Sequence, residues 1–249
     1  MYTPPFEITS KIIELISNIS EKIGEINSLQ DSPYHVKLRK ENRIKTIHSS
    51  LAIENNSLSI KQITAIIDGK RVLGNPNEIK EVKNSIQAYD LLLSLNPYKE
   101  KDLLKAHKLM MQDLAARNGK YRTDGVGIFD GEKVVHMAPP ADRVPELMGD
   151  LFEWLKTSDV HPLIKSCVFH YEFEFIHPFQ DGNGRIGRLI MFKECLKNNI
   201  VPFIIDDNIK LFYYRGLKEW ENEKGFLTDT CLSAQDKFKA YLDYFKIKG

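Results

Sequence analysis

The chain has 249 residues, of which 42% are hydrophobic and 28% are charged, an ordinary composition for a globular protein with a sizeable core. Its 35 basic and 34 acidic side chains nearly cancel, so no overall charge points to nucleic acid or to a membrane surface as a partner. Residues Met1–Phe6 lack the features of a signal peptide, and no apolar run is long enough to span a bilayer, which together predict a cytoplasmic protein.

Apolar residues recur at helical spacing along almost the whole chain, which predicts a mainly helical, all-α fold in a single domain over residues 1–249. The first two stripes consist of Ile8, Ile12, Leu15, Ile19, Ile23 and Ile26, and of Ile79, Val82, Ile86, Tyr89 and Leu93. Residues that break helices interrupt the pattern at 31–33, 74–76, 96–97, 119, 139–140 and 201–202. Helices of ordinary length with short connections are therefore expected.

Three cysteines lie far apart in the sequence, each among apolar neighbours: Cys167, Cys195 and Cys231. An odd number of scattered cysteines favours small core residues over metal ligands or disulfides. We therefore expect all three to be buried as free thiols.

An apolar stripe within residues 34–56 runs into an acidic position. Ile44, Ile47 and Leu51 are spaced three or four apart, and the next position of the stripe is Glu54. A carboxylate on a buried helix face needs a cationic partner, because burying it unpaired is costly. The local pattern fits equally a helix that ends after Glu54 and leaves this side chain in solvent.

Residues 119–140 contain the one stretch with strand-like spacing. Val126 and Ile128 alternate with small residues, a tight turn is expected at residues 130–131, and residues 134–135 lead back. This pattern predicts a β-hairpin. Since an isolated hairpin is marginal in water, it must pack on the helical body or receive a third strand from elsewhere.

Residues 164–200 predict a helix, a loop with glycines and a second helix that begins at about Arg185. The loop between them reads His-Pro-Phe-Gln-Asp-Gly-Asn-Gly from residue 177. The free backbone N–H groups at the start of a helix bind anions. Gly182 and Gly184 would let the backbone come close to such an anion.

Four side chains of this segment supply groups for a transfer from a nucleoside triphosphate. Arg185 and Arg188 lie one turn apart, so both guanidinium groups can reach one polyphosphate. Asp181 can hold a divalent cation, since magnesium usually takes one or two carboxylates. His177 is placed to accept a proton from an attacking hydroxyl near neutral pH. Each feature alone is more often structural, but their combination in one short segment indicates a site.

Residues 177–188 match the motif His-Pro-Phe-x-Asp/Glu-Gly-Asn-Gly-Arg-x-x-Arg of the Fic family without a departure. The resemblance extends to residues 119–122, to the prolines at 139–140 and to the tyrosines at 213–214. It implies a compact helical Fic fold with a β-hairpin flap. It also implies a protein adenylyltransferase that uses ATP and Mg²⁺ to move AMP onto a Tyr, Thr or Ser hydroxyl of a target protein.

The resemblance implies roles for individual residues. His177 would be the base, Asp181 would hold Mg²⁺, and Arg185 and Arg188 would bind the β- and γ-phosphates. The α-phosphate would be surrounded by Gly182, Asn183 and Gly184. Either Tyr213 or Tyr214 would border the nucleotide base. The flap residues Val134, Val135, His136 and Met137 would line the site and take an extended target segment as an added strand.

The segment Ser50-Leu51-Ala52-Ile53-Glu54-Asn55 fits the Ser/Thr-x-x-x-Glu-Gly/Asn inhibitory motif of Fic proteins. Its position before the catalytic motif resembles the autoinhibited class with an N-terminal inhibitory helix, here within residues 34–56. In that class the glutamate pairs with the second arginine of the motif, which is Arg188 here, and ATP is held unproductively. Two anions then compete for one guanidinium group.

Other readings of the same residues remain. A Doc-like kinase would transfer the γ-phosphate, but such proteins depart from Gly-Asn-Gly-Arg in the loop. Removal of AMP is a further alternative, with Glu54 positioning a water molecule. From a different class, Gly182-x-Gly184-x-x-Gly187 matches a dinucleotide fingerprint, with residues 201–205 and Asp206 imitating a second strand and its acid.

The dinucleotide reading does not suit its context, because the segment that would form the first strand contains Glu172 and Glu174, although a parallel strand is buried on both faces. A binding module without activity would leave the reactive residues unused. The implied partner is a target protein with a hydroxyl side chain. Self-modification and a homo-oligomer stay open, and neither nucleic acid nor a membrane is expected.

Overall fold

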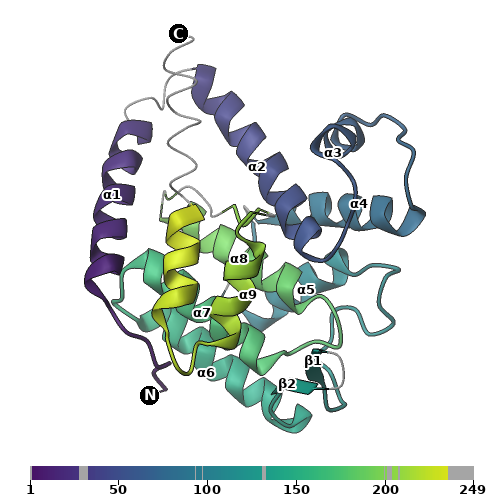
Figure 1. Cartoon of the computed structure of the whole chain (residues 1–249). Coiled ribbons are helices and arrows are strands. Elements are labelled where there is room, and N and C mark those ends of the chain that lie inside the picture. Colours follow the sequence, from purple (N-terminus) through teal and green to yellow (C-terminus); the bar gives the residue numbers. More distant parts are fainter. Residues whose placement is uncertain are drawn as a thin grey trace.

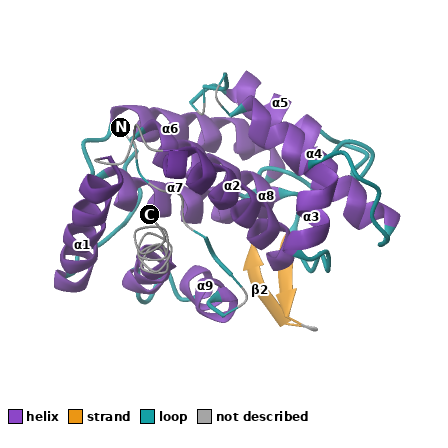
Figure 2. Cartoon of the chain, turned by 90° about the horizontal axis from the view of Figure 1, so that it is seen from above, coloured by secondary structure: helices purple, strands orange, loops and turns teal. Residues whose placement is uncertain are grey.

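The computed structural model describes residues 2–27, 33–92, 94–96, 98–130, 133–198, 200, 204–206 and 208–234. Within these ranges the protein is helical apart from one hairpin, which confirms the predicted fold class (Figures 1 and 2). The α-helices are α1 (Ser10–Asn27), α2 (Pro33–Ile53), α3 (Ile60–Ile67), α4 (Pro76–Leu91), α5 (Glu100–Met110), α6 (Val144–Thr157), α7 (Pro162–Ile176), α8 (Asn183–Lys197) and α9 (Lys210–Lys218). A short 3-10 helix, η1 (Ala141–Arg143), precedes α6, and residues 225–234 are also helical.

Local capping explains several helix starts. Ser59 and Gln62 form a capping box at the start of α3, in which each side chain bonds the backbone of the other. Asn75 caps α4 by accepting a hydrogen bond from the N–H of Asn77, and Pro76 occupies the first helical position, where its missing N–H costs nothing. The breaks predicted at residues 74–76 therefore act as a helix start.

Helices α7 and α8 form the centre of the molecule, with α2, α5, α6 and α9 around them (Figure 1). Nearly every residue of α7 is buried, which agrees with its apolar residues lying on all sides of the helix. Phe169 and Phe173 of α7 pack with Phe179 of the following loop in the core. The three cysteines are buried and form no disulfide among the described residues, as predicted.

The predicted apolar stripes mostly face the core. Ile12, Leu15 and Ile19 of α1 are buried. Ile8 is an error, because it precedes the start of α1 and is 52% exposed. In α4, Val82 and Tyr89 are buried, while Ile79 and Ile86 are partly buried. The side chains of Ile23 and Ile26, and residues 93, 97 and 201–202, lie outside what the structure describes.

The predicted hairpin is present as β1 (Gly127–Asp130) and β2 (Lys133–Met137), which pair antiparallel with a β-bulge after Ile128 (Figure 2). Its sheet has two strands within the described residues. His136 Nε2 donates to the carbonyl of Phe175 at 2.8 Å, which ties the hairpin to the end of α7. The hairpin therefore packs on the helical body, which is one of the two arrangements expected from the sequence.

The described residues contain no parallel sheet, and Gly187 lies inside α8. The dinucleotide reading therefore fails among these residues, because it requires a parallel strand directly before the glycines. None of the described helices is long and apolar enough to cross a membrane.

Candidate active site

The loop between α7 and α8 is built by two residues with left-handed backbone conformations. His177 ends α7 with φ 49° and ψ 61°, and Gly182 precedes α8 with φ 84°. Helix α8 begins at Asn183, two residues before the expected start at Arg185. No side chain caps this end, so the first N–H groups of α8 remain free to bind an anion.

The His177 ring has a defined tautomer. Its Nδ1 lies 3.3 Å from the carbonyl oxygen of Glu174. A carbonyl only accepts, so Nδ1 carries the proton and Nε2 keeps its lone pair. Burial lowers the pKa of His177, and the nearby His136 and Arg122 act in the same direction. The imidazole is therefore neutral at pH 7 and can accept a proton through Nε2.

Arg122 fixes the His177 loop to the hairpin, a role that the sequence did not reveal. Its buried guanidinium group donates to the backbone carbonyls of Asp124, Pro139, Ile176 and His177. The bond to the His177 carbonyl measures 2.8 Å, and the Arg122 N–H donates to the Pro178 carbonyl at 3.0 Å. One side chain thus sets the position of the loop relative to the flap.

His107 of α5 supports the other end of the loop and was also missed. Its Nε2 donates to the Asp181 carbonyl at 2.9 Å, and its Nδ1 accepts from the N–H of Gly119 at 2.8 Å. Burial lowers the pKa of His107 to about 4, so the ring stays neutral. Gly182 suits this position because of its left-handed backbone, with φ 84°, and because a Cβ atom would lie 2.7 Å from the Met111 sulfur. The sequence did contain one signal for His107, because this histidine lies at the spacing of the buried residues of α5.

Asn183 is buried and closes the loop internally. Its Oδ1 accepts from the Phe179 N–H at 2.8 Å, and its Nδ2 donates to the Phe179 carbonyl at 2.9 Å. The side chain is therefore held in place by the loop that it closes, which fixes the backbone N–H of Asn183 at the start of α8.

Asp181 offers one carboxylate to a metal ion. Its side chain is 59% exposed, and its Oδ1 accepts from the Gly182 N–H and from Arg185 Nη2, the latter at 3.0 Å. The other oxygen has no partner among the described residues. Within the described ranges, no group of three or more His, Cys, Asp or Glu side chains gathers there either. A single carboxylate with one oxygen available fits Mg²⁺, which completes its shell with water and phosphate oxygens.

Arg185 is buried between two carboxylates. Its Nη2 meets Asp181 at 3.0 Å, and its Nη1 meets Glu81 of α4 at 3.4 Å. Glu81 in turn accepts from Asn56 Nδ2 at 2.8 Å. Glu81 could not be found from the sequence, because it lies far along the chain from Arg185 and in no recognisable motif with it. The guanidinium group is thus held in place from two sides.

Arg188 makes the predicted ion pair with Glu54, with Nη2 and Oε1 2.6 Å apart. It also donates to Ser50, from Nη2 to the carbonyl at 2.9 Å and from Nε to Oγ at 3.0 Å. Burial would raise the pKa of Glu54, but the charge and hydrogen bond of Arg188 outweigh it and hold this pKa below its usual value. Glu54 follows the end of α2 and its side chain is 34% exposed, but it is paired with Arg188 and not free in solvent.

Gly184 makes room for this ion pair. A Cβ atom at residue 184 would lie 2.6 Å from Glu54 Oε1 and 2.8 Å from Arg188 Nη1. The Glu54 carboxylate therefore sits directly over the first turn of α8. This is the same end of the helix that offers its free N–H groups to an anion.

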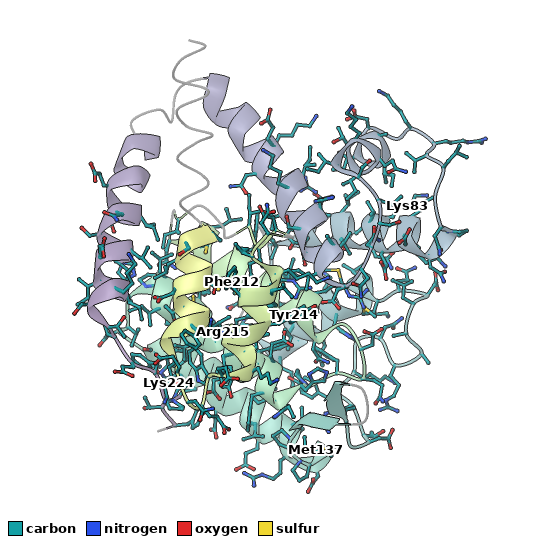
Figure 3. The ribbon with its side chains drawn as sticks, viewed as in Figure 1. Lys83, Met137, Phe212, Tyr214, Arg215 and Lys224 are labelled. Atoms are coloured by element: carbon teal, nitrogen blue, oxygen red, sulfur yellow. The ribbon has the colours of Figure 1, made fainter. Side chains whose placement is uncertain are left out.

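The segment that carries Glu54 is anchored to α9. Asn55 ends the helix with φ 67°, a conformation that asparagine adopts at helix C-termini. Lys210 Nζ donates to the Ala52 carbonyl at 3.1 Å and to Asn55 Oδ1 at 3.2 Å. Tyr214 donates its hydroxyl to the Ile53 carbonyl at 3.0 Å. Figure 3 shows Tyr214 on α9, and its contact with Ile53 holds this end of α2 in place.

Of the other residues expected to line the site, only some contact the segment from His177 to Arg188. Tyr213 is buried and turns its hydroxyl toward Arg188 at 3.4 Å, while Tyr214 is 44% exposed. Met137 is exposed on the hairpin, at the lower edge of Figure 3. The side chains of residues 134–135 lie outside the described part of the flap.

The chain is similar to known proteins in sequence and in fold. Residues 97–195 match the model of the Fic/DOC family. The crystal structure of a Fic family protein from Desulfovibrio desulfuricans G20 superposes with a TM-score of 0.89 at 46% identity, covering 98% of this chain and 77% of that one. Fic-1 from Caenorhabditis elegans has a TM-score of 0.84 at 21% identity over 96% of this chain and 74% of that one, which supports the fold alone.

Among curated relatives, protein adenylyltransferase Fic of Nematostella vectensis is 26% identical over 223 residues, which cover 83% of this chain and 50% of that protein. The chain thus spans about half the length of this relative. The chain is 46% identical to the Desulfovibrio protein over 98% of its own length. It therefore belongs to the Fic family.

Proposed function

We propose that this chain is a protein adenylyltransferase that moves AMP from ATP to a Tyr, Thr or Ser hydroxyl of a target protein, and that Glu54 restrains it. The observation that carries the proposal is the Glu54–Arg188 ion pair over the start of α8, the helix that follows the loop in which His177 keeps Nε2 as a proton acceptor. The name of the Nematostella relative supports the same activity.

The site residues divide the work of the transfer. His177 Nε2 takes the proton of the target hydroxyl, whose oxygen attacks the α-phosphorus as the bond to the β-phosphate breaks and pyrophosphate leaves. The N–H groups at the start of α8 stabilise charge on the α-phosphate, and Arg185 and Arg188 stabilise charge on the leaving group. Asp181 would hold Mg²⁺, which neutralises phosphate charge when bound.

Glu54 would restrain the transfer because it competes with the γ-phosphate of ATP for Arg188. Its Nη2 donates to Glu54 at 2.6 Å, and the γ-phosphate needs the same group. While Glu54 holds the guanidinium group, the triphosphate lacks one of its two cationic contacts and is not aligned for attack. Release of Glu54 would restore that contact.

The target would dock on the hairpin. The sheet has two strands among the described residues, and its Met137 side chain is exposed. An extended target segment can add to the free edge by backbone hydrogen bonds, which would bring its hydroxyl toward the His177 loop.

The test is transfer of label from ATP tagged at its α-phosphate onto a lysate or onto the protein itself. Glu54→Gly should raise labelling about 5- to 150-fold over the parent, the range expected for such a coupling. Glu78→Ala is the matched control, since Glu78 is a nearby acid that bonds Ser57 and not Arg188, and it should stay at the parent level. The double variant Glu54→Gly, Arg188→Ala should lose the gain.

Intact mass of the target protein after incubation with ATP separates the family's chemistries, since AMP and phosphate add different masses. Equal, vigorous labelling by the parent and by Glu54→Gly would refute the restraint and leave the transfer standing. Added phosphate in place of AMP would instead favour the kinase reading.

Removal of AMP is the second candidate. The Glu54 carboxylate stands over the anion site with one oxygen bonded to Arg188, and its side chain is 34% exposed, so its other oxygen can hold a water molecule. Release of AMP from a modified protein by the parent, lost in Glu54→Gln, would support this activity. If the parent leaves that protein intact, this reading is excluded.

A further inference from the structure

A buried pair of side chains lies beside Arg188 and has no part in the proposed transfer. His170 of α7 and Tyr213 of α9 are almost fully buried, and the His170 Nε2 lies 2.6 Å from the Tyr213 hydroxyl. The same hydroxyl lies 3.4 Å from Arg188 Nη1. Three helices thus meet through one chain of polar contacts.

The direction of each hydrogen bond follows from the chemistry of the groups. A guanidinium group only donates, so the Tyr213 oxygen accepts from Arg188. The hydroxyl still has its own proton to donate, and His170 Nε2 is the acceptor within reach, which assigns the proton of the neutral imidazole to Nδ1. Burial, together with the charge of Arg188, lowers the pKa of His170 to about 3, so the ring stays neutral.

Gly187 provides the space for this arrangement. A Cβ atom at residue 187 would lie 2.6 Å from His170 Nδ1 and 2.9 Å from Glu174 Oε1. Glycine in the interior of a helix weakens it. The glycine within α8 is therefore explained by the close passage of His170 beneath the helix.

The partners of Arg188 fall into two groups. Ser50 and Glu54 both belong to the end of α2 and the residue that follows it. Among the described residues, Tyr213 is the hydrogen-bonding partner that comes from another element. If the α2 segment moves away, Tyr213 is the contact that stays.

We infer that Tyr213, oriented by His170, is a positioning residue that holds the Nη1 side of Arg188 while Nη2 is exchanged between Glu54 and the terminal phosphate of ATP. This inference rests on the proposed function. An arginine that is held on one side has already lost part of its side-chain freedom, so less is lost when the phosphate binds. Tyr213 then serves the phosphate end of the nucleotide, which leaves Tyr214 as the residue that borders its base.

The first test compares the dissociation constant of ATP, measured by calorimetry, in Glu54→Gly with and without Tyr213→Phe. Loss of the hydroxyl should weaken binding about five- to tenfold. In a Glu54→Gly, Arg188→Ala protein, Tyr213→Phe should have no further effect, because the group that it positions is gone. Tyr98→Phe is the matched control, since its hydroxyl donates to Glu194 on the same helix α8, away from Arg188, and it should leave ATP binding unchanged.

The second test needs no substitution at Tyr213 and stands even if that variant unfolds. Nitrogen NMR of the Glu54→Gly protein should show His170 protonated at Nδ1, with Nε2 as acceptor and no titration above pH 5. A proton on Nε2, equal ATP affinity with and without the Tyr213 hydroxyl, or additive effects of Tyr213→Phe and Arg188→Ala would each overturn the inference.

These outcomes are distinct from failure of the proposed function. A Glu54→Gly protein that binds ATP but transfers no AMP refutes the transfer, while the binding cycle still reports on Tyr213. A protein that transfers AMP with an additive cycle refutes this inference alone. Absence of ATP binding refutes both.

Discussion

Glu174 is a buried carboxyl group directly beneath the arginine that binds Glu54. Burial raises the pKa of Glu174 to about 8, although Arg188 opposes the shift and Glu54 adds to it. His170 Nδ1 is 4.0 Å away, but both groups are neutral at pH 7, so the contact is not an ion pair.

This pKa makes the free energy of unfolding depend on pH. The native state binds the Glu174 proton more tightly than the unfolded chain, so the contribution is complete below about pH 4.5 and is lost as the pH rises through about 8. Glu174→Gln should flatten the decline over this range in urea unfolding experiments. Parallel pH profiles for the two proteins would show that the carboxyl group is ionised in the native state.

At the scale of elements, the ends of α2 and α8 are where sequence reasoning was least accurate. The prediction placed the start of α8 at about Arg185 because it assigned both Gly182 and Gly184 to the loop. Gly184 instead lies in its first turn, where the Glu54 carboxylate leaves no room for a Cβ atom. The α2 helix does end near Glu54, yet the turn at Asn55 follows that side chain and leaves it facing Arg188.

The hairpin and the His177 loop are joined by Arg122, so we expect Arg122→Ala to uncouple them. In the Glu54→Gly background the turnover number for AMP transfer should fall about 100-fold, since small misplacements of reacting groups cost that much, while ATP affinity changes little. Arg122→Lys should not restore the rate, because one ammonium group cannot replace a planar fork that bonds four carbonyls.

Arg117 is exposed, so Arg117→Ala is the matched control for this prediction. It should keep the full turnover number for AMP transfer. Unfolding curves measured alongside would identify loss of structure. A folded Arg122→Ala protein with an undiminished turnover number would show that the loop does not depend on the hairpin for its position.

At the scale of the whole molecule, the helical class, the hairpin and the His177–Arg188 loop could be predicted, because each depends on a pattern in contiguous residues. The Glu54–Arg188 pair was predictable across the chain only because both ends belong to recognisable motifs. Contacts without such motifs, such as those of Arg122, His107 and Glu81, could not be found. Periodicity relates residues within a few turns, and these partners meet only after the chain folds.

The central claim is that Glu54 and the γ-phosphate compete for Arg188, and the preference for ATP over ADP tests it most directly. ADP lacks the γ-phosphate, so calorimetry should give the parent nearly equal affinity for the two nucleotides. Glu54→Gly should prefer ATP by about tenfold or more, as expected for a charge-assisted contact, and Glu54→Gly, Arg188→Ala should lose that preference. The same ratio of ATP to ADP affinity in the parent and in Glu54→Gly would contradict the competition.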